Sequence, residues 1–262
     1  MTHVLAIDQG TSGTKAIVVD DAGRVLAIAE IALFPTYLAG GGVEQDPEAL
    51  WNSVVEAGRR ALGEAGVPVA AVALANQGET VLAWDRRTGR ALTPAIVWQD
   101  RRAEVICAAL AESGDDVARR TGLVLDPYFS APKMAWVRQN LTRDGVVTTT
   151  DTWLLHRLCG AFVTDVSTAS RSLLLDLDTT TWSDHLLELF GLSSEDLPTL
   201  VACDEIIGQT DAFGPPAIPV AGLIVDQQAA LLAESCLKPG AAKCTYGTGA
   251  FLLAQLLSLI HI

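Results

Sequence analysis

The segment from Asp8 to Lys15 holds the first residues whose types and spacing could do chemistry. Its sequence is Asp-Gln-Gly-Thr-Ser-Gly-Thr-Lys, between two apolar runs. Glycines let backbone N–H groups turn toward one point, while Thr11 and Ser12 offer hydroxyls and Lys15 a charge, so the segment could bind phosphate. Asp8 could hold hydrated Mg²⁺ beside it. A hairpin turn without a ligand explains the same residue types, and the GxxxxGK[ST] pattern of a P-loop is absent.

Apolar runs flank this segment and predict the elements that must position it. Two short connections join β-rich runs at 4–7, 15–19 and 25–29, which is typical of an antiparallel meander. Asp46 and Pro47 predict the start of a helix that continues to residue 62. Further strands are expected at 69–75, 81–84, 95–98, 173–175 and 218–223. Further helices are expected at 101–112, within 126–140, and at 150–158, 185–190 and 227–236. This order indicates an α/β fold class with a mixed sheet and flanking helices.

The composition excludes several classes of protein. The chain has 262 residues, of which 50% are hydrophobic, and a formal net charge of −13, so it can bury a large core and lacks the basic character of a nucleic-acid binder. Its five cysteines form no CxxC pair, which favours a reducing compartment over a disulfide framework. The N-terminus lacks a secretory signal, and the apolar stretch 250–262 is shorter than the roughly 17–25 residues of a membrane-spanning helix. We therefore expect a cytoplasmic protein with no nucleic-acid and no membrane partner.

Further motifs follow in order along the chain. They are Asn76–Thr80, Ile96–Arg102, Asp126–Ser130, Val225–Gln228 and Thr245–Phe251. A longer stretch from Tyr128 to Asn140 carries Ser130, Lys133, Trp136 and Gln139. Together with the first segment, these motifs closely resemble the FGGY family of carbohydrate kinases over about residues 3–255, and the stretch 128–140 resembles that family's signature.

The resemblance implies a ribonuclease-H-like domain of the type found in actin, hexokinase and Hsp70. It implies ATP-dependent transfer of a phosphoryl group to a hydroxyl of glycerol or a related polyol or sugar, with ATP and Mg²⁺ as cofactors and Asp226 as the catalytic base. It implies a substrate pocket formed by Glu79, Trp98, Tyr128, Asp226, Gln227 and Phe251. It also implies that the nucleotide's phosphates bind Gly10, Thr11, Ser12, Lys15, Gly247, Thr248 and Gly249, and that Asp8 holds Mg²⁺ through water.

Several of these residues also have a purely structural interpretation. Asp226 could be the N-cap of the helix that follows it, and both roles can hold at once. Trp98 and Phe251 could be ordinary core residues, and Glu79 could be a solvated surface charge. The sequence leaves these alternatives open.

Two positions depart from the family pattern. Lys15 stands where glycerol-phosphorylating members usually have Arg, and it keeps the charge but loses the bidentate fork. Gly78 stands where those members have an Arg that contacts substrate hydroxyls. Because such charge-assisted hydrogen bonds contribute about 1.5–3 kcal/mol each, its loss predicts roughly 10–100-fold weaker glycerol binding unless another group substitutes. We expect Gly78 to vacate volume and the acceptor to be a polyol or sugar other than glycerol.

Full-length members of the family have two actin-like domains, and the resemblance here ends early. We expect residues 1–246 to form the N-terminal, substrate-binding domain and 247–262 to begin the C-terminal nucleotide domain, with a tail at 256–262 that does not resemble the family. On this interpretation the chain is truncated, strand residues 244–255 lack sheet partners, and the chain binds polyol weakly and does not turn over ATP. A homodimer or homotetramer is left open for the full-length enzyme. The alternatives are a non-catalytic polyol-binding or regulatory module, and a protein anchored by residues 250–262.

Overall fold

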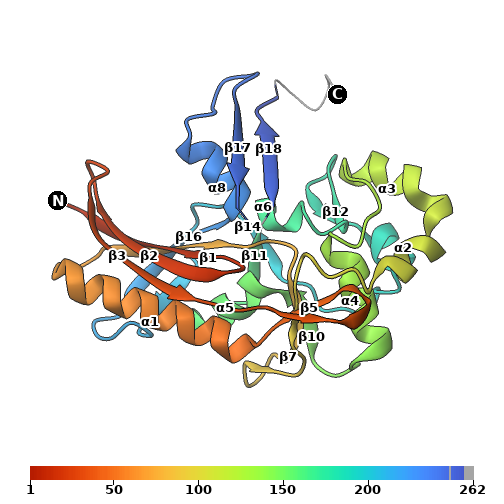
Figure 1. Cartoon of the computed structure of the whole chain (residues 1–262), viewed down its shortest axis with the longest axis horizontal. Helices are drawn as coiled ribbons and strands as arrows, with labels where there is room; N and C mark the ends of the chain where they lie inside the picture. Colours follow the sequence, from red (N-terminus) through yellow and green to blue (C-terminus); the bar gives the residue numbers. More distant parts are fainter. Residues whose placement is uncertain (248, 257–262) are drawn as a thin grey trace.

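Alternating apolar residues at the N-terminus form the antiparallel half of a central sheet. The computed structural model, which describes residues 1–247 and 249–256, has β1 at His3–Gln9, β2 at Gly13–Asp20 and β3 at Val25–Ala32. Every second residue of β2 is buried, as expected for a strand with one face on the core. β1 pairs with β2 and β2 with β3, both antiparallel, so the predicted meander is confirmed (Figure 1).

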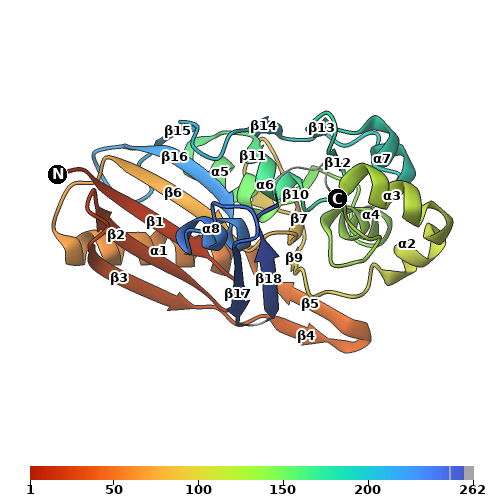
Figure 2. The same cartoon turned by 90° about the horizontal axis from the view of Figure 1, so that it is seen from above.

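Two later strands extend this sheet in the parallel direction. β6 (Ala71–Asn76) pairs with β1, and β16 (Ile218–Val225) pairs with β6, both parallel. The short β15 (Gly208–Thr210) closes the edge, which gives the order β15-β16-β6-β1-β2-β3 (Figure 2). The sheet is therefore mixed, as the sequence predicted, and β1, β6 and β16 end at the same edge.

The first long helix covers one face of this sheet. α1 spans Pro47–Ala65 and buries apolar residues such as Leu50, Val54 and Ala61 at helical spacing (Figure 1). The Asp46 side chain accepts from the backbone N–H of Glu48 at 3.0 Å, so the predicted N-cap is confirmed. The helix continues through Gly63 and ends at Gly66, whose φ of 62° is the left-handed conformation that favours glycine at a C-cap.

A second sheet lies beside the first and carries the other half of the core. Its strands are β4 (Thr36–Leu38), β5 (Gly42–Gln45), β9 (Ala95–Ile96), β7 (Val81–Asp85) and β10 (Val146–Thr149), in the order β10-β7-β9-β5-β4, with β8 (Arg90–Ala91) paired to β7. α4 (Ser130–Asn140) packs on it through residues such as Met134 and Val137.

The remaining elements connect and cover the sheets. The helices are α2 (Glu104–Ala109), α3 (Gly114–Thr121), α5 (Thr150–Cys159), α6 (Val166–Ala169), α7 (Asp184–Leu189) and α8 (Asp226–Ala233), with 3₁₀ turns at Ala39–Gly41 and Ala111–Ser113. The short strands are β11 (Val163–Asp165), β12 (Leu175–Asp176), β13 (Thr181–Trp182) and β14 (Thr199–Val201).

The strand predicted at 95–98 is shorter, at Ala95–Ile96, and the helix predicted at 227–236 spans Asp226–Ala233. Two further predicted elements differ for reasons that the structure shows. The helix predicted at 101–112 begins only at Glu104, because the Asp100 carboxylate accepts from the backbone N–H groups of Val43 and Arg102 and holds a turn there. The strand predicted at 173–175 is wrong except for Leu175, since Leu173 has a φ of 65°, which no strand residue adopts.

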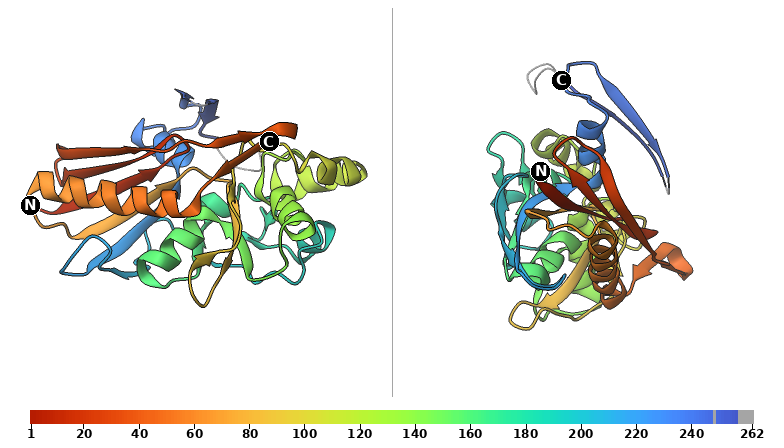
Figure 3. Two further views of the ribbon diagram at one scale, coloured as in Figure 1. Left: turned by 60° about the horizontal axis from the view of Figure 1, so that its bottom comes forward. Right: turned by 90° about the vertical axis from the view of Figure 1, so that its left-hand side faces the viewer.

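The strands β17 (Ala242–Tyr246) and β18 (Ala250–Ala254) pair with each other and, within residues 1–247 and 249–256, with no other strand. They project from the rest of the chain, as Figure 3 (right) shows. This agrees with the expectation that this region lacks sheet partners. The predicted boundary between residues 246 and 247 falls in their connecting turn and stays a prediction. Most of the tail predicted at 256–262 lies outside the described residues.

Two further findings concern the cysteines and the length and polarity of the helices. All five cysteines lie among the described residues and are free thiols. Within the described part of the chain, the helices are too short or too polar to cross a bilayer.

The close approach of α1 to Phe213 generates a stability prediction. A Cβ on Gly58 would lie 2.5 Å from Phe213 Cε1, whereas a Cβ on Gly63 of the same helix would meet no described atom within 4 Å. We expect Gly63→Ala to raise the free energy of unfolding by about 0.5–1 kcal/mol through helix propensity. Gly58→Ala should lower it by about 1–3 kcal/mol through overpacking. Urea unfolding of both variants checks this, and equal stabilities would contradict the packing.

Candidate functional site

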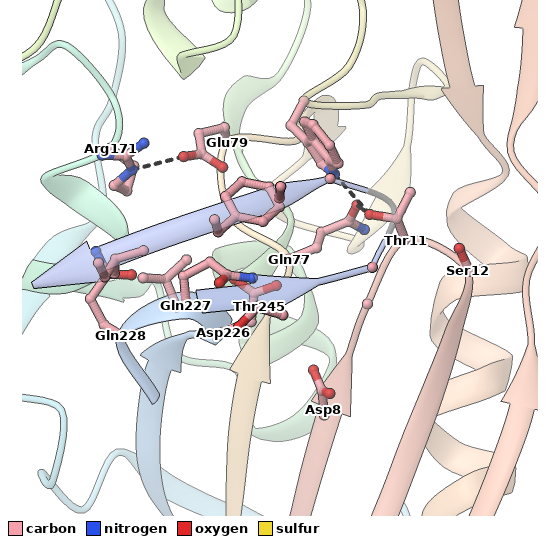
Figure 4. A pocket seen from close by; sticks show the side chains of 18 of the residues that line it. Asp8, Thr11, Ser12, Gln77, Glu79, Arg171, Asp226, Gln227, Gln228 and Thr245 are labelled. Atoms are coloured by element: carbon pink, nitrogen blue, oxygen red, sulfur yellow. Dashed lines mark hydrogen bonds and ion pairs between the residues drawn. The ribbon is translucent and has the colours of Figure 1, made fainter. Parts of the chain in front are cut away.

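The carboxyl ends of the three parallel strands meet at one edge of the central sheet. Asp8 pairs with Ala75 across β1 and β6, and Val225 pairs with Asn76 across β16 and β6. The residues just after these pairs therefore lie side by side, as expected for ligand sites in sheets with parallel strands. They open into a cleft of about 760 Å³ (Figure 4). Its lining includes Asp8, Gly10, Thr11, Ser12, Lys15, Gln77, Glu79, Trp98, Tyr128, Arg171, Asp226, Gln227, Gln228, Thr245, Gly247, Gly249 and Phe251.

Among the described residues, every predicted site residue lies in this cleft. Asp8, Glu79 and Asp226 face it from β1, the turn after β6 and the start of α8 (Figure 4). Thr248 lies outside the described residues. The individual roles predicted for these residues stay predictions, and the following contacts bear on each.

The turn between β1 and β2 forms one wall of the cleft and also makes structural hydrogen bonds. The backbone N–H of Gly10 donates to the carbonyl of Gly13 at 2.9 Å, and Ser12 lies exposed at the tip. The Thr11 hydroxyl donates to Gln77 Oε1 at 3.2 Å and accepts from Trp98 Nε1 at 2.8 Å. The Thr11 side chain thus connects the predicted phosphate turn to the predicted substrate wall.

Three aromatic side chains form the apolar wall of the cleft. The ring of Trp98 lies edge-on to Tyr128 at 5.7 Å and to Phe251 at 5.8 Å between centroids. A Cβ on Gly249 would lie 2.9 Å from Phe251 and 3.5 Å from Trp98, so only glycine lets the turn after β17 approach this closely. Trp98 and Phe251 are partly exposed in the cleft, which favours the pocket interpretation over ordinary core.

Glu79 is buried at the far end of the cleft. Its exposed fraction is 3%, so the interpretation as a solvated surface charge is wrong. Its Oε1 accepts from Arg171 Nε at 2.8 Å. Burial raises the pKa of Glu79, and the charge and hydrogen bond of Arg171 oppose this rise. Its backbone φ of 47° is unusual for a residue other than glycine, and such strain is concentrated at functional sites.

The carboxyl groups of Asp226 and Asp8 both have raised pKa values, because nearby positive charge does not offset their desolvation. Asp226 is the first residue of α8, with Val225 in the N-cap position. Burial, and then the charge of Asp8, raises the pKa of Asp226 to about 6. Enclosure by the cleft walls raises the pKa of Asp8, although Lys15 opposes the rise. A divalent cation between the two would relieve both effects, and Mg²⁺ typically uses one or two carboxylates with water and phosphate oxygens. The donor set therefore fits Mg²⁺.

The loop that carries Tyr128 is fixed by a buried lysine. Lys133 is fully buried, and its Nζ donates to the carbonyls of Pro127, Tyr128 and Phe129 at 3.0, 2.5 and 2.7 Å. Burial lowers the pKa of Lys133 to about 7, while Glu79 opposes this shift. Lys133 is therefore a positioning residue for Tyr128.

Several lining residues were not predicted as site residues. Gln77 and Gln228 fall inside motifs that the sequence analysis noted, so a signal existed for them. Arg171 had no motif or spacing to mark it. Lys243 lies outside the lining, but its Nζ donates to Gln227 Oε1 at 2.5 Å and to Thr245 Oγ1 at 2.8 Å, which links β17 to α8.

Gly78 does not leave open volume, so that expectation is wrong. A Cβ at this position would lie 2.7 Å from Val225 Cγ2, and the φ of Gly78 is 67°. The side chain of Val225 occupies the space.

Comparisons with known proteins agree with this geometry. Residues 3–233 match the FGGY family of carbohydrate kinases, N-terminal domain. The chain is 45% identical to a glycerol kinase of Leptothrix cholodnii over 97% of this chain, and 46% identical to one of Thermus brockianus over 97%. In both cases the match covers 54% of the relative, so the chain spans about half the length of the curated relatives it matches.

Solved structures show the same fold. The crystal structure of Plasmodium falciparum glycerol kinase with ADP superposes with a TM-score of 0.91 at 31% identity, over 96% of this chain and 54% of that one. A xylulose kinase from Lactobacillus acidophilus superposes with a TM-score of 0.89 at 20% identity, over 96% of this chain and 54% of that one. At this identity the likeness shows the fold alone. The predicted actin- and hexokinase-type α/β fold is confirmed.

The coupling between the two carboxylates can be measured without any ligand. We expect the Asp226 carboxyl to titrate by ¹³C NMR with a pKa of about 6. Asp8→Asn should lower this pKa, because it removes the charge that disfavours a second carboxylate. Glu234→Gln, at the other end of α8, is the matched control and should leave it unchanged. A normal pKa for Asp226 would contradict the proposed crowding of charge.

The conformation of Gly78 gives a second test. We expect Gly78→Ala to lower the free energy of unfolding by about 1–3 kcal/mol through its positive φ, with a further loss from contact with Val225. Gly23→Ala is the control, since Gly23 has a φ of 76° and a Cβ there would meet no described atom within 4 Å. Denaturant unfolding should show a larger loss of unfolding free energy for Gly78→Ala than for Gly23→Ala. Equal losses would contradict the predicted clash, since they would show that the Val225 side chain moves aside.

Proposed function

The chain belongs to the FGGY family of carbohydrate kinases, and on that premise we propose that it supplies the acceptor pocket and the catalytic base of an ATP-dependent polyol kinase. The observation that carries this proposal is the shared cleft. A carboxylate with a raised pKa, a second carboxylate suited to Mg²⁺ and an aromatic wall face the same space. Such a mixture of apolar walls and few convergent polar groups is typical of a small-ligand site.

The proposed reaction needs one proton acceptor beside the polyol. The Asp226 carboxylate takes the proton of the reacting hydroxyl, and that oxygen forms a bond to the γ-phosphorus of ATP as the bond to the β–γ bridging oxygen breaks. The products are the phosphorylated polyol and ADP, with the proton on Asp226. A base with a pKa of about 6 is deprotonated at neutral pH and still basic enough to help.

The phosphate side of the cleft has the donors for this transfer. The backbone of Gly10 to Gly13, the Ser12 side chain and Lys15 line it beside Asp8, and Gly247 and Gly249 face them from the turn after β17. Asp8 would hold Mg²⁺ through water, and bound Mg²⁺ supplies positive charge to the phosphates. Positioning and charge stabilisation of this kind contribute most of the catalysis in phosphoryl transfer.

The acceptor is proposed to be glycerol or a closely related polyol. The relatives' names favour glycerol. The absence of an arginine at position 78 favours another acceptor, unless another cation contacts the polyol. We further propose that the enzyme acts in the cytoplasm and that ATP turnover needs the half that the relatives have beyond this match. Whether such an enzyme is a homodimer or homotetramer stays open.

Polyol binding to the chain itself tests the acceptor pocket. The indole N–H of Trp98 lies in the cleft, so its ¹⁵N–¹H resonance reports on occupancy. We expect glycerol to shift this resonance with a Kd of about 1 mM or weaker. Glu79→Gln should weaken binding, whereas Glu195→Gln, outside the cleft, should leave it unchanged. If glycerol, erythritol, xylitol and ribitol all left Trp98 unshifted, the acceptor pocket would be rejected.

Phosphoryl transfer is the second readout. The chain alone should form no ADP above background with ATP, Mg²⁺ and polyol. The chain fused to the C-terminal half of the Thermus brockianus glycerol kinase should form ADP in a polyol-dependent way. In that fusion, Asp226→Asn should lower kcat by about 10²–10⁴. Turnover that survives this substitution would contradict the assigned base.

A further inference from the structure

A cation that the sequence motifs did not mark lies at the acceptor end of the cleft. Arg171 follows α6 and lies beside Glu79 (Figure 4). Tyr128 lines the same cleft. Its side chain is 25% exposed, and its Nε donates to Glu79 Oε1 at 2.8 Å. Its guanidinium carbon lies 5.0 Å from the ring centroid of Phe129 and 5.6 Å from that of Tyr128. The guanidinium is thus paired with a carboxylate and lies over two aromatic rings.

Glu79 depends on this arginine for its charge. A buried carboxylate without a partner becomes neutral or destabilises the fold. The other nearby cation, Lys133, already donates to three backbone carbonyls, so it cannot pair with Glu79 directly. Arg171 makes the ion pair, and its guanidinium lies over the Tyr128 ring. Glu79 engages the Nε of Arg171, and the guanidinium of this cleft-lining residue carries further N–H donors.

We propose that Arg171 is a specificity-determining residue that, with Glu79, binds two adjacent hydroxyls of the acceptor. Glu79 accepts from one hydroxyl, and Arg171 donates to its neighbour, while Asp226 faces the hydroxyl that reacts. This proposal rests on the proposed function and names its substrate class, a neutral polyol with a vicinal diol beside the reacting hydroxyl. The guanidinium would take the place that a side chain at position 78 cannot occupy, because Val225 fills the space there.

The pairing of opposite charges explains why a neutral polyol fits. An amino alcohol would bring a second cation against Arg171, and a sugar acid would bring a second anion against Glu79. A diol whose hydroxyls are separated by a methylene would leave one of the two charged groups without its partner. The pocket should therefore prefer glycerol to propane-1,3-diol, which lacks the middle hydroxyl.

The test measures polyol binding to the 262-residue chain through the Trp98 indole resonance. Arg171→Gln should weaken glycerol binding about 10–100-fold, because it removes a charge-assisted hydrogen bond. Arg171→Lys should have an intermediate effect, since lysine keeps the charge without the fork. The preference for glycerol over propane-1,3-diol should shrink in both variants. In a cycle with Glu79→Gln, the two losses should not add, because the residues act as a pair.

A matched control removes an ion pair elsewhere. Arg138 pairs with Glu195 outside the cleft, and the two side chains are 13% and 7% exposed. Arg138→Gln should reduce stability yet leave the glycerol Kd unchanged. A further readout needs no ligand, since Arg171→Gln should raise the pKa of the Glu79 carboxyl in a ¹³C NMR titration by removing the opposing charge.

The outcomes separate this inference from the function on which it rests. If wild-type protein binds glycerol and Arg171→Gln binds it equally well, the role of Arg171 is rejected while the acceptor pocket stands. If the wild-type protein binds no polyol, both are rejected. Should Arg171→Gln fail to fold, the Lys variant decides, and an unchanged Kd and unchanged diol preference there would overturn the proposal.

Discussion

The parallel alignment of β1, β6 and β16 is the constraint on which the site depends. Parallel neighbours end at the same edge, so residues from positions 8, 77–79 and 226 become adjacent although the chain separates them widely. Asn76 strengthens this edge, because its side chain donates to the carbonyl of Ile224 and to the hydroxyl of Thr168. A slip of the β1–β6 pairing by one residue would turn Asp8 to the other face of the sheet.

A buried hydrogen-bond network joins the two sides of the cleft. Gln77 accepts from the hydroxyls of Thr11 and Thr80 and donates to Gln45. Gln45 in turn donates to the backbone carbonyl of Thr11 at 2.7 Å. Thr11 also accepts from Trp98, so the turn between β1 and β2 and the aromatic wall of the cleft are held by the same residues. Buried networks of this kind are rigid when each member is satisfied, which suits a reaction controlled by positioning.

The charge of the cleft is set by a few nearby side chains and not by the net charge of the whole chain. Asp8, Glu79 and Asp226 face it, with Lys15 and Arg171 as the cations beside them. The pKa values of all three carboxyls are raised, so keeping them charged in the cleft at neutral pH lowers stability. The net charge of −13 is therefore compatible with phosphate binding, because glycine-rich backbone and Lys15 act on a ligand over short distances.

The sequence by itself determined the meander, the first helix, the family and most of the cleft residues. Strand periodicity, the Asp46-Pro47 cap and the glycine-rich turn are local signals, and local signals survive without tertiary context. Only the tertiary structure decided how those residues act. It buried Glu79, placed Asp226 as the first helical residue of α8 with Val225 as the N-cap, engaged the Thr11 hydroxyl with Trp98 and filled the space beside Gly78 with Val225. It also brought Arg171 to Glu79 across 92 positions of sequence, because the partner of a buried charge is selected by proximity in the fold and leaves no pattern in the chain.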